Sequence, residues 1–132
     1  MSEMVASLPY RIKRVYEPFR PEDNTRVLID RLWPRGITRE RAHIDLWLKD
    51  IAPSPALRAW FGHDPARWGE FQRRYRAELR ALEGPVARVE GLAAAGPVTL
   101  VYAAQDTVHN HARVLADYLG QHWGASHVAP AG

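Results

Sequence analysis

The sequence predicts a single α/β domain, with a mainly parallel sheet of about four strands and helices packed around it. Two short apolar runs, residues 27–29 and 98–102, have the β-branched composition of strands buried on both faces. Amphipathic helical patterns lie between and after these runs, as expected of βαβ units. The length of 132 residues suits one domain, and no linker or internal repeat divides it.

The first third of the chain predicts two strands. Residues 10–16 alternate polar and apolar side chains, and the proline-containing segment 17–25 reads as a loop. The second strand is expected over residues 26–32. It must end there, because Pro34 disfavours the α region for the residue before it.

The middle of the chain predicts one short helix and one ambiguous segment. Thr38 is a suitable N-cap for a helix over residues 39–43. Residues 44–51 fit both a helical stripe and strand alternation. We favour a strand from about 45 to 51, because residues 52–55 form a natural loop beyond it.

Capping residues then predict three helices. Ser54 and Gly62 bracket a short helix over residues 55–61. A longer helix follows Asp64 and is stopped by Gly84–Pro85, and another helix spans about 86–94. The apolar stripe of the longer helix consists of Trp68, Phe71, Tyr75, Leu79 and Leu82.

The last strand, residues 98–102, is followed by a final helix capped by Asp106 or Thr107. Residues 1–8 and 124–132 lack periodic pattern and are expected to be loose tails. The inward stripe of the final helix is predicted to be Val108, Ala112, Leu115, Leu119 and Trp123.

Composition narrows the classes of function. No apolar run approaches the roughly 20 residues needed to cross a bilayer, and no secretory signal begins the sequence. The absence of cysteine removes disulfides, thiolate catalysis and cysteine metal ligands, so we expect a cytoplasmic protein. The net charge is +3, and every Lys and Arg except Arg113 lies at or before Arg88. This basic front favours an anionic partner.

The first candidate site follows the second strand, since ligands of open α/β sheets bind beyond the carboxyl ends of the strands. Arg31 and Arg35 are permanent cations whose planar donors match phosphate or carboxylate oxygens. Trp33 offers a flat face to a ring. The structural alternative is that Arg31 pairs with Asp30 or Asp45 and that Trp33 caps the sheet. The candidate ligand-binding residues are Arg31, Trp33, Arg35, Gly36, Lys49 and Asn110.

The second candidate site is the segment 106–111, which leads from the last strand into a helix. Free backbone N–H groups there favour an anion. His109 and His111 are candidate proton donors or acceptors near neutral pH, and Asp106 would orient a histidine or cap the helix. The alternative for His111 is a hydrogen bond to a backbone carbonyl.

We expect no metal and no cofactor. On a helix His109 and His111 would point about 200° apart, so they could not grip one ion together. A zinc site built from these two and His63 remains an alternative without support from a zinc motif. The sequence also lacks the glycine-rich nucleotide motifs and the GxSxG nucleophile elbow.

Several segments resemble the YeaO-like family of small bacterial proteins, part of a larger set with a domain of unknown function. The resemblance covers residues 10–122 and is carried by LWPRG, LWLKDIAPS, WFGHDP and the His-Asn-His segment. It implies a strand over 45–51, and it implies that segments 31–36 and 106–111 share one sheet edge. A related branch has a Cys-His-Arg triplet where this chain has Asn110, His111 and Ala112, so thiol chemistry does not transfer.

The leading hypothesis is therefore a strand-end cleft that binds an anionic small molecule, with or without catalysis. One rival is a nucleic-acid-binding module that uses the basic front and its tryptophans. Its candidate cations are Arg73, Arg74, Arg76 and Arg80. A second rival is a protein-interaction domain with no small-molecule site.

Overall fold

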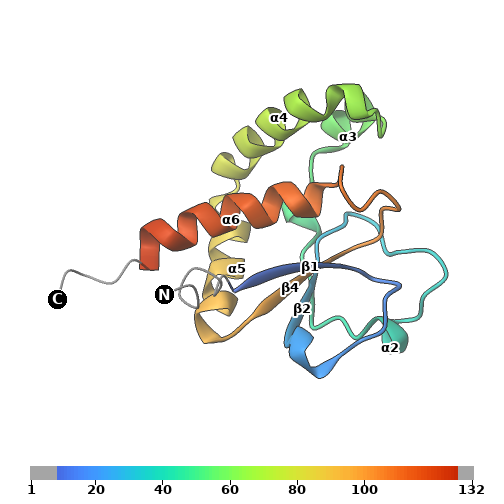
Figure 1. Ribbon diagram of the computed structural model, residues 1–132, viewed down its shortest axis with the longest axis vertical. Helices are drawn as coiled ribbons and strands as arrows, with labels where there is room; N and C mark the ends of the chain where they lie inside the picture. Colours follow the sequence, from blue (N-terminus) through green and yellow to red (C-terminus); the bar gives the residue numbers. More distant parts are fainter. Residues whose placement is uncertain (1–8, 128–132) are drawn as a thin grey trace.

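The protein is a single α/β domain built on a four-stranded, all-parallel sheet, as the sequence predicts (Figure 1). The computed structural model describes the backbone of residues 9–127 and the side chains of residues 9–123. The predicted tail 1–8 and residues 128–132 of the predicted tail 124–132 lie outside the described residues. Residues 124–127 continue the last helix of the chain, so the prediction of a loose tail was wrong there. In spatial order the strands are β1 (Tyr10–Arg14), β4 (Val98–Tyr102), β2 (Thr25–Leu28) and β3 (Leu46–Trp47).

The two apolar runs of the sequence form the two central strands. All five residues of β4 are buried, and Val27, Leu28 and Ile29 are 0% exposed. β4 pairs with β1 on one side and with β2 on the other. The carboxyl ends of all four strands consequently lie at one edge of the sheet.

Three strands are shorter than predicted. β1 ends at Arg14, since a turn hydrogen bond from the Glu17 N–H to the Arg14 carbonyl follows. β2 ends at Leu28 instead of continuing to residue 32, and it pairs with only two residues of β3. Residues 49–51 form a 3-10 turn instead of extending that strand. The prediction of a strand in this region is confirmed, but its length was wrong.

The helices are α2 (Arg39–Ala42), α3 (Pro55–Phe61), α4 (Trp68–Ala81), α5 (Glu83–Ala95) and α6 (His111–His127). Short 3-10 turns, η1 (Pro21–Asp23) and η3 (Pro65–Arg67), precede β2 and α4. The predicted caps of α2 and α3 are confirmed. The Thr38 hydroxyl accepts from the Arg41 N–H, the Ser54 hydroxyl accepts from the Leu57 N–H, and Gly62 is left-handed with φ 54°.

Two helix starts differ from the predictions. Gly84 and Pro85 lie inside the first turn of α5, where proline is tolerated because its missing N–H has no helical partner. α6 begins at His111, not after Asp106 or Thr107, because the Asn110 side chain accepts from the Arg113 N–H.

One face of the sheet carries the main core. α6 packs across β1 and β4, and α4 packs against α6 and α3 (Figure 1). The inward residues of α4 are Phe71, Tyr75 and Leu79, each at most 2% exposed. Trp68 packs on this core, as the apolar stripe predicts, and is partly buried. Val108 precedes α6 and is 49% exposed, so it does not belong to the helical stripe.

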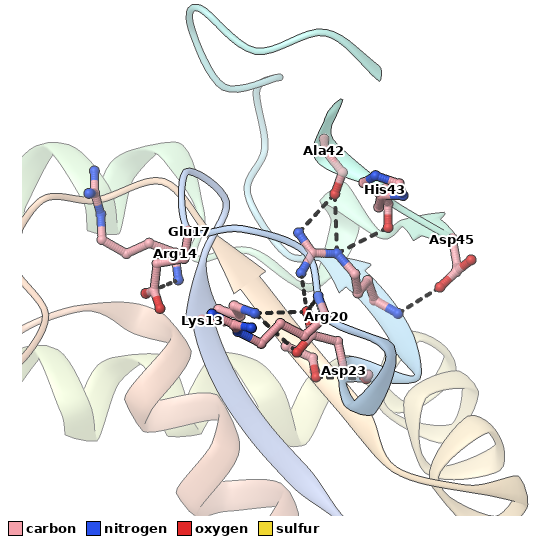
Figure 2. Close-up of polar contacts among 10 residues, drawn as sticks. Lys13, Arg14, Glu17, Arg20, Asp23, Ala42, His43 and Asp45 are labelled. Atoms are coloured by element: carbon pink, nitrogen blue, oxygen red, sulfur yellow. Dashed lines mark hydrogen bonds and ion pairs between the residues drawn. The ribbon is translucent and has the colours of Figure 1, made fainter. Parts of the chain in front are cut away.

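A buried ion cluster fixes the start of β2 (Figure 2). The Arg26 guanidinium is fully buried and donates to the Asp23 carboxylate and to the Ala42 and His43 carbonyls. The Lys13 ammonium also donates to Asp23. Burial by itself raises the pKa of Asp23, but hydrogen bonds from Lys13 and from the backbone and side-chain donors around it outweigh burial and lower this pKa.

Among the helices in the described part of the chain, none is long and apolar enough to span a membrane.

Candidate functional site

A cavity of about 810 Å³ opens at the carboxyl edge of the sheet. Its walls come from the segments after β2 and β4, from the loop before α3, and from α3 with the turn that follows it. The lining residues are Asp30, Arg31, Leu32, Arg35, Ala52, Pro53, Arg58, His63, Ala103, Ala104, Gln105, Asp106 and His111. The two candidate segments of the sequence thus contribute to one cavity, through Arg31 and Arg35 from one and Asp106 and His111 from the other.

His111 joins the start of α6 to the end of β2. Its Nε2 lies 3.0 Å from the Ile29 carbonyl oxygen and 3.2 Å from Oδ1 of Asp30. Because a carbonyl oxygen only accepts, Nε2 carries the hydrogen and the neutral ring has its lone pair on Nδ1. The other Asp30 oxygen accepts from the Ala103 N–H at 3.0 Å. His111 therefore makes the expected carbonyl hydrogen bond and lines the cavity as well.

Asp106 shapes the turn before α6. Its carboxylate accepts from the His109 and Val108 N–H groups, both at 2.8 Å, and lies 3.0 Å from the His109 Nδ1. The backbone hydrogen bond from His109, then that from Val108, and then the His109 ring lower the pKa of Asp106 to about 2. Asp106 is therefore an ionised acceptor at neutral pH and orients the His109 ring, which meets Trp68 edge to face at 5.3 Å.

His109 lies in this turn, not in α6. The helical-wheel argument that separated it from His111 therefore does not apply. Both rings line a second, smaller cavity beside the first. In the part of the chain that the structure describes, no cluster of three His, Cys, Asp or Glu side chains lies close enough to hold a metal ion. The absence of a metal remains a prediction.

Three arginines supply the positive charge of the larger cavity. Arg31 donates from Nη2 to the Ala52 and Pro53 carbonyls at 3.3 Å, while its buried Nε has no hydrogen-bond partner among the described residues. Arg35 and Arg58 are exposed, and the described residues offer neither guanidinium a hydrogen bond or an ion pair. The exposed guanidinium groups of Arg35 and Arg58 therefore present N–H donors to the cavity that the described residues do not satisfy.

The considered pairing of Arg31 with an aspartate is not formed. Asp30 is occupied by His111 and the Ala103 N–H, and the Asp45 carboxylate accepts from the Arg26 N–H at 2.8 Å. Backbone carbonyls hold Arg31 instead, so its positive charge is not cancelled locally.

Trp33 and Lys49 do not line this cavity. The indole N–H of Trp33 donates to the Ile37 carbonyl at 2.8 Å, and the ring meets Trp47 edge to face. The Lys49 ammonium lies 4.4 Å from the centroid of the Trp47 ring. Both residues belong to the packing on the far side of β2, which is the structural alternative considered for Trp33.

Gly36 and Asn110 support the cavity without lining it. Gly36 has φ 75°, which glycine adopts without strain, and it redirects the chain just after Arg35. Asn110 is 3% exposed, and its amide donates to the Asp106 carbonyl while capping α6. Asn110 does contribute to the smaller cavity.

Two of the arginines and histidines that line the cavity, Arg58 and His63, were not assigned to an anion site by sequence. Arg58 has no feature that separates it from other helix-surface arginines. His63 was considered only as a metal ligand. It has φ 57° directly after the left-handed Gly62, and two such residues in succession return the chain to the cavity. The Gly62–His63 pair after a capped helix was the one feature of the sequence that indicated a sharp turn of the chain at His63.

The fold and this edge define a small, all-parallel α/β protein with an arginine-lined cleft. Residues 9–131 match the family described as the Inactive DUF488-N3 subclade, and the chain belongs to that family. The resemblance to YeaO-like proteins is thereby confirmed.

The chain is similar to uncharacterised bacterial proteins. It is 44% identical over 107 residues to the protein YeaO of Escherichia coli, covering 81% of this chain and 93% of that protein. It is 41% identical over 116 residues to Rv3073c of Mycobacterium tuberculosis, covering 88% and 98% respectively. No solved structure matches the sequence.

Proposed function

We propose that this protein is a binding protein for a small anion carrying a phosphate or carboxylate group, held in the carboxyl-edge cavity. The observation that carries the proposal is the convergence of three arginines on one cavity, where the guanidinium groups of Arg35 and Arg58 have no hydrogen bond or ion pair with the described residues. Guanidinium groups match the oxygens of such anions in pairs of parallel hydrogen bonds.

The balance of charge supports the proposal. Two carboxylates also line the cavity. Asp30 accepts from the Ala103 N–H with one oxygen, and its other oxygen lies 3.2 Å from the His111 ring without a hydrogen bond from the described residues. Asp106 accepts from two backbone N–H groups and lies beside the His109 ring. The three guanidinium charges have no such compensation. A bound anion would neutralise these positive charges.

Binding without chemistry is the better-supported form of the proposal. No serine, threonine, tyrosine, lysine or cysteine lines the cavity, so a covalent step there could use only its carboxylates or imidazoles, and the Asp106 carboxylate is held by two backbone N–H groups. Asn110, at the position where the related branch has cysteine, is engaged in capping α6. The description of the family as an inactive subclade agrees with this.

The surface contacts argue against the nucleic-acid alternative. Arg73 and Arg74 are both paired with Glu70 on the surface of α4. The Trp60 ring is covered by the guanidinium of Arg74 at 4.2 Å and that of Arg67 at 5.2 Å. Such a ring is not free to stack with bases, which is what single-strand binding requires.

Thermal unfolding in a panel of anions tests the proposal. Phosphate, sulfate and acetate are compared with chloride at equal ionic strength, and at least one should raise Tm, since a ligand of the native state stabilises it by mass action. Arg35→Ala should abolish the shift, whereas Arg80→Ala, an exposed arginine of α4 outside the cavity, should retain it. No shift with any anion, or an undiminished shift in Arg35→Ala, would refute the proposal.

A further inference from the structure

A second cavity of about 350 Å³ adjoins the arginine-lined one and differs from it in chemistry. Pro55 and Ala59 of α3, together with Phe61 and Phe71, line only this second cavity and form its apolar wall. The polar residues that line only this cavity are His109 and Asn110. The residues that line both cavities are Pro53, Arg58, His63, Ala104 and His111. Because the two cavities share these walls, they form neighbouring compartments of one cleft.

The apolar wall is preformed. Phe61 stacks on Phe71 with ring centroids 4.4 Å apart, and Phe71 in turn stacks on Trp68 at 5.7 Å. Phe61 and Phe71 are only 6% and 2% exposed, so core packing holds their rings in place. A ligand that contacts this wall would lose little affinity to ordering of the protein.

The cations are confined to one side of the apolar compartment. Among the residues that the structure describes, Arg58 is the only arginine or lysine that lines it, and Arg58 also lines the larger cavity. His63 and His111 stand at the same shared wall. A ligand whose anionic group meets the arginines would therefore place a directly attached group among Phe61, Phe71 and Ala59.

We infer that the ligand is an organic anion in which a phosphate or carboxylate is separated by at most a short link from one ring-sized apolar group. This inference rests on the proposed function, since the anion fixes which end of the ligand faces the arginines. The smaller compartment has the size of a small-molecule pocket but offers too few charges for a second anionic group.

Matched pairs of anions test the inference. Inorganic phosphate is compared with phenyl phosphate, and acetate with phenylacetate, by isothermal titration calorimetry. The phenyl member of at least one pair should bind about tenfold more tightly, as burial of a ring against an apolar wall predicts.

Ala59→Trp should remove this preference by filling the compartment, while leaving the affinity for inorganic phosphate or acetate unchanged. Ala59 is exposed on a surface helix, so the larger side chain does not disturb the core. Ala56→Trp is the matched control, because Ala56 is an exposed residue of the same helix that lines neither cavity. It should keep the preference.

The outcomes separate the two proposals. Equal affinity within both pairs, or a phenyl preference that survives Ala59→Trp, overturns the inference while anion binding lost in Arg35→Ala still supports the proposed function. Binding of none of the four anions overturns both.

Discussion

His111 Nε2 and Asp30 Oδ1 lie 3.2 Å apart, which joins the first residue of α6 to the segment immediately after β2. The same nitrogen lies 3.0 Å from the Ile29 carbonyl oxygen. One imidazole therefore connects the start of α6 to the residues just before the Arg31–Gly36 segment, and His111 and Asp30 both line the arginine-rich cavity.

His111→Ala should lower the free energy of unfolding by about 1–3 kcal/mol, because it leaves the Ile29 carbonyl without its donor and removes the ring that lies beside the mostly buried Asp30 carboxylate. Urea denaturation at neutral pH measures the loss. Asp117→Ala, at an exposed residue of the same helix, should change stability by no more than about 0.5 kcal/mol. Equal effects of the two substitutions would contradict the structural role of His111.

Asp106 should contribute to acid sensitivity. Its folded-state pKa is about 2, against 3.8 ordinarily, so the unfolded chain binds more protons between these values. The stabilisation is complete above about pH 5 and is lost as the pH falls toward 2. Asp106→Asn should therefore lose less stability than the wild type between pH 5 and pH 2.5. Thr107→Ala, a neighbouring exposed and non-titrating position, should lose as much as the wild type.

Arg26→Met should destabilise the protein by about 3–5 kcal/mol, since it leaves the buried Asp23 carboxylate without one of its partners. It also removes the donors to the Ala42 and His43 carbonyls (Figure 2). Arg11→Ala, at an exposed residue of β1, is the control and should cost no more than about 0.5 kcal/mol. A small effect of Arg26→Met on the urea midpoint would show that the cluster is not needed for stability.

Tyr10 should contribute to alkaline sensitivity. Burial first, and the nearby Glu90 charge second, raise the pKa of Tyr10 to about 12 from an ordinary value of 10.0. Between these values the unfolded chain loses a proton that the native state keeps, so stability falls as the pH rises from 10 to 12. The free energy of unfolding of Tyr10→Phe, measured by urea titration, should fall less than that of the wild type between pH 9 and pH 11.5. Identical dependence on pH in the two proteins would contradict this assignment.

The parts of the fold that local chemistry determines were predictable. Ser54 and Gly62 define α3 because a side-chain oxygen and a left-handed glycine satisfy the helix ends wherever that helix packs. The lengths of the strands were not predictable, because they depend on pairing between strands: β3 pairs with only two residues of β2. The start of α6 was missed because Asp106 and Asn110 are both good caps, and the first closes a separate turn.

The candidate site was predictable at the level of segments and not of side chains. The rule that parallel strands share a carboxyl edge predicted that Arg31 and Asp106 lie at the same edge of the sheet, and both residues line one cavity there. It could not show that the Trp33 ring turns to the far side of β2, because a tryptophan after a strand fits either side. Nor could it add Arg58, whose place depends on how α3 packs against the edge.

The most direct measurement of anion binding in this cavity is a titration of ¹⁵N-labelled protein with inorganic phosphate, followed through the arginine Nε–H resonances. The Nε–H signals of Arg31, Arg35 and Arg58 should shift together and saturate with one dissociation constant, while those of Arg73, Arg74 and Arg80 on α4 should not saturate. Absence of saturable shifts at the three cavity arginines, or larger shifts on α4, would contradict the proposed site.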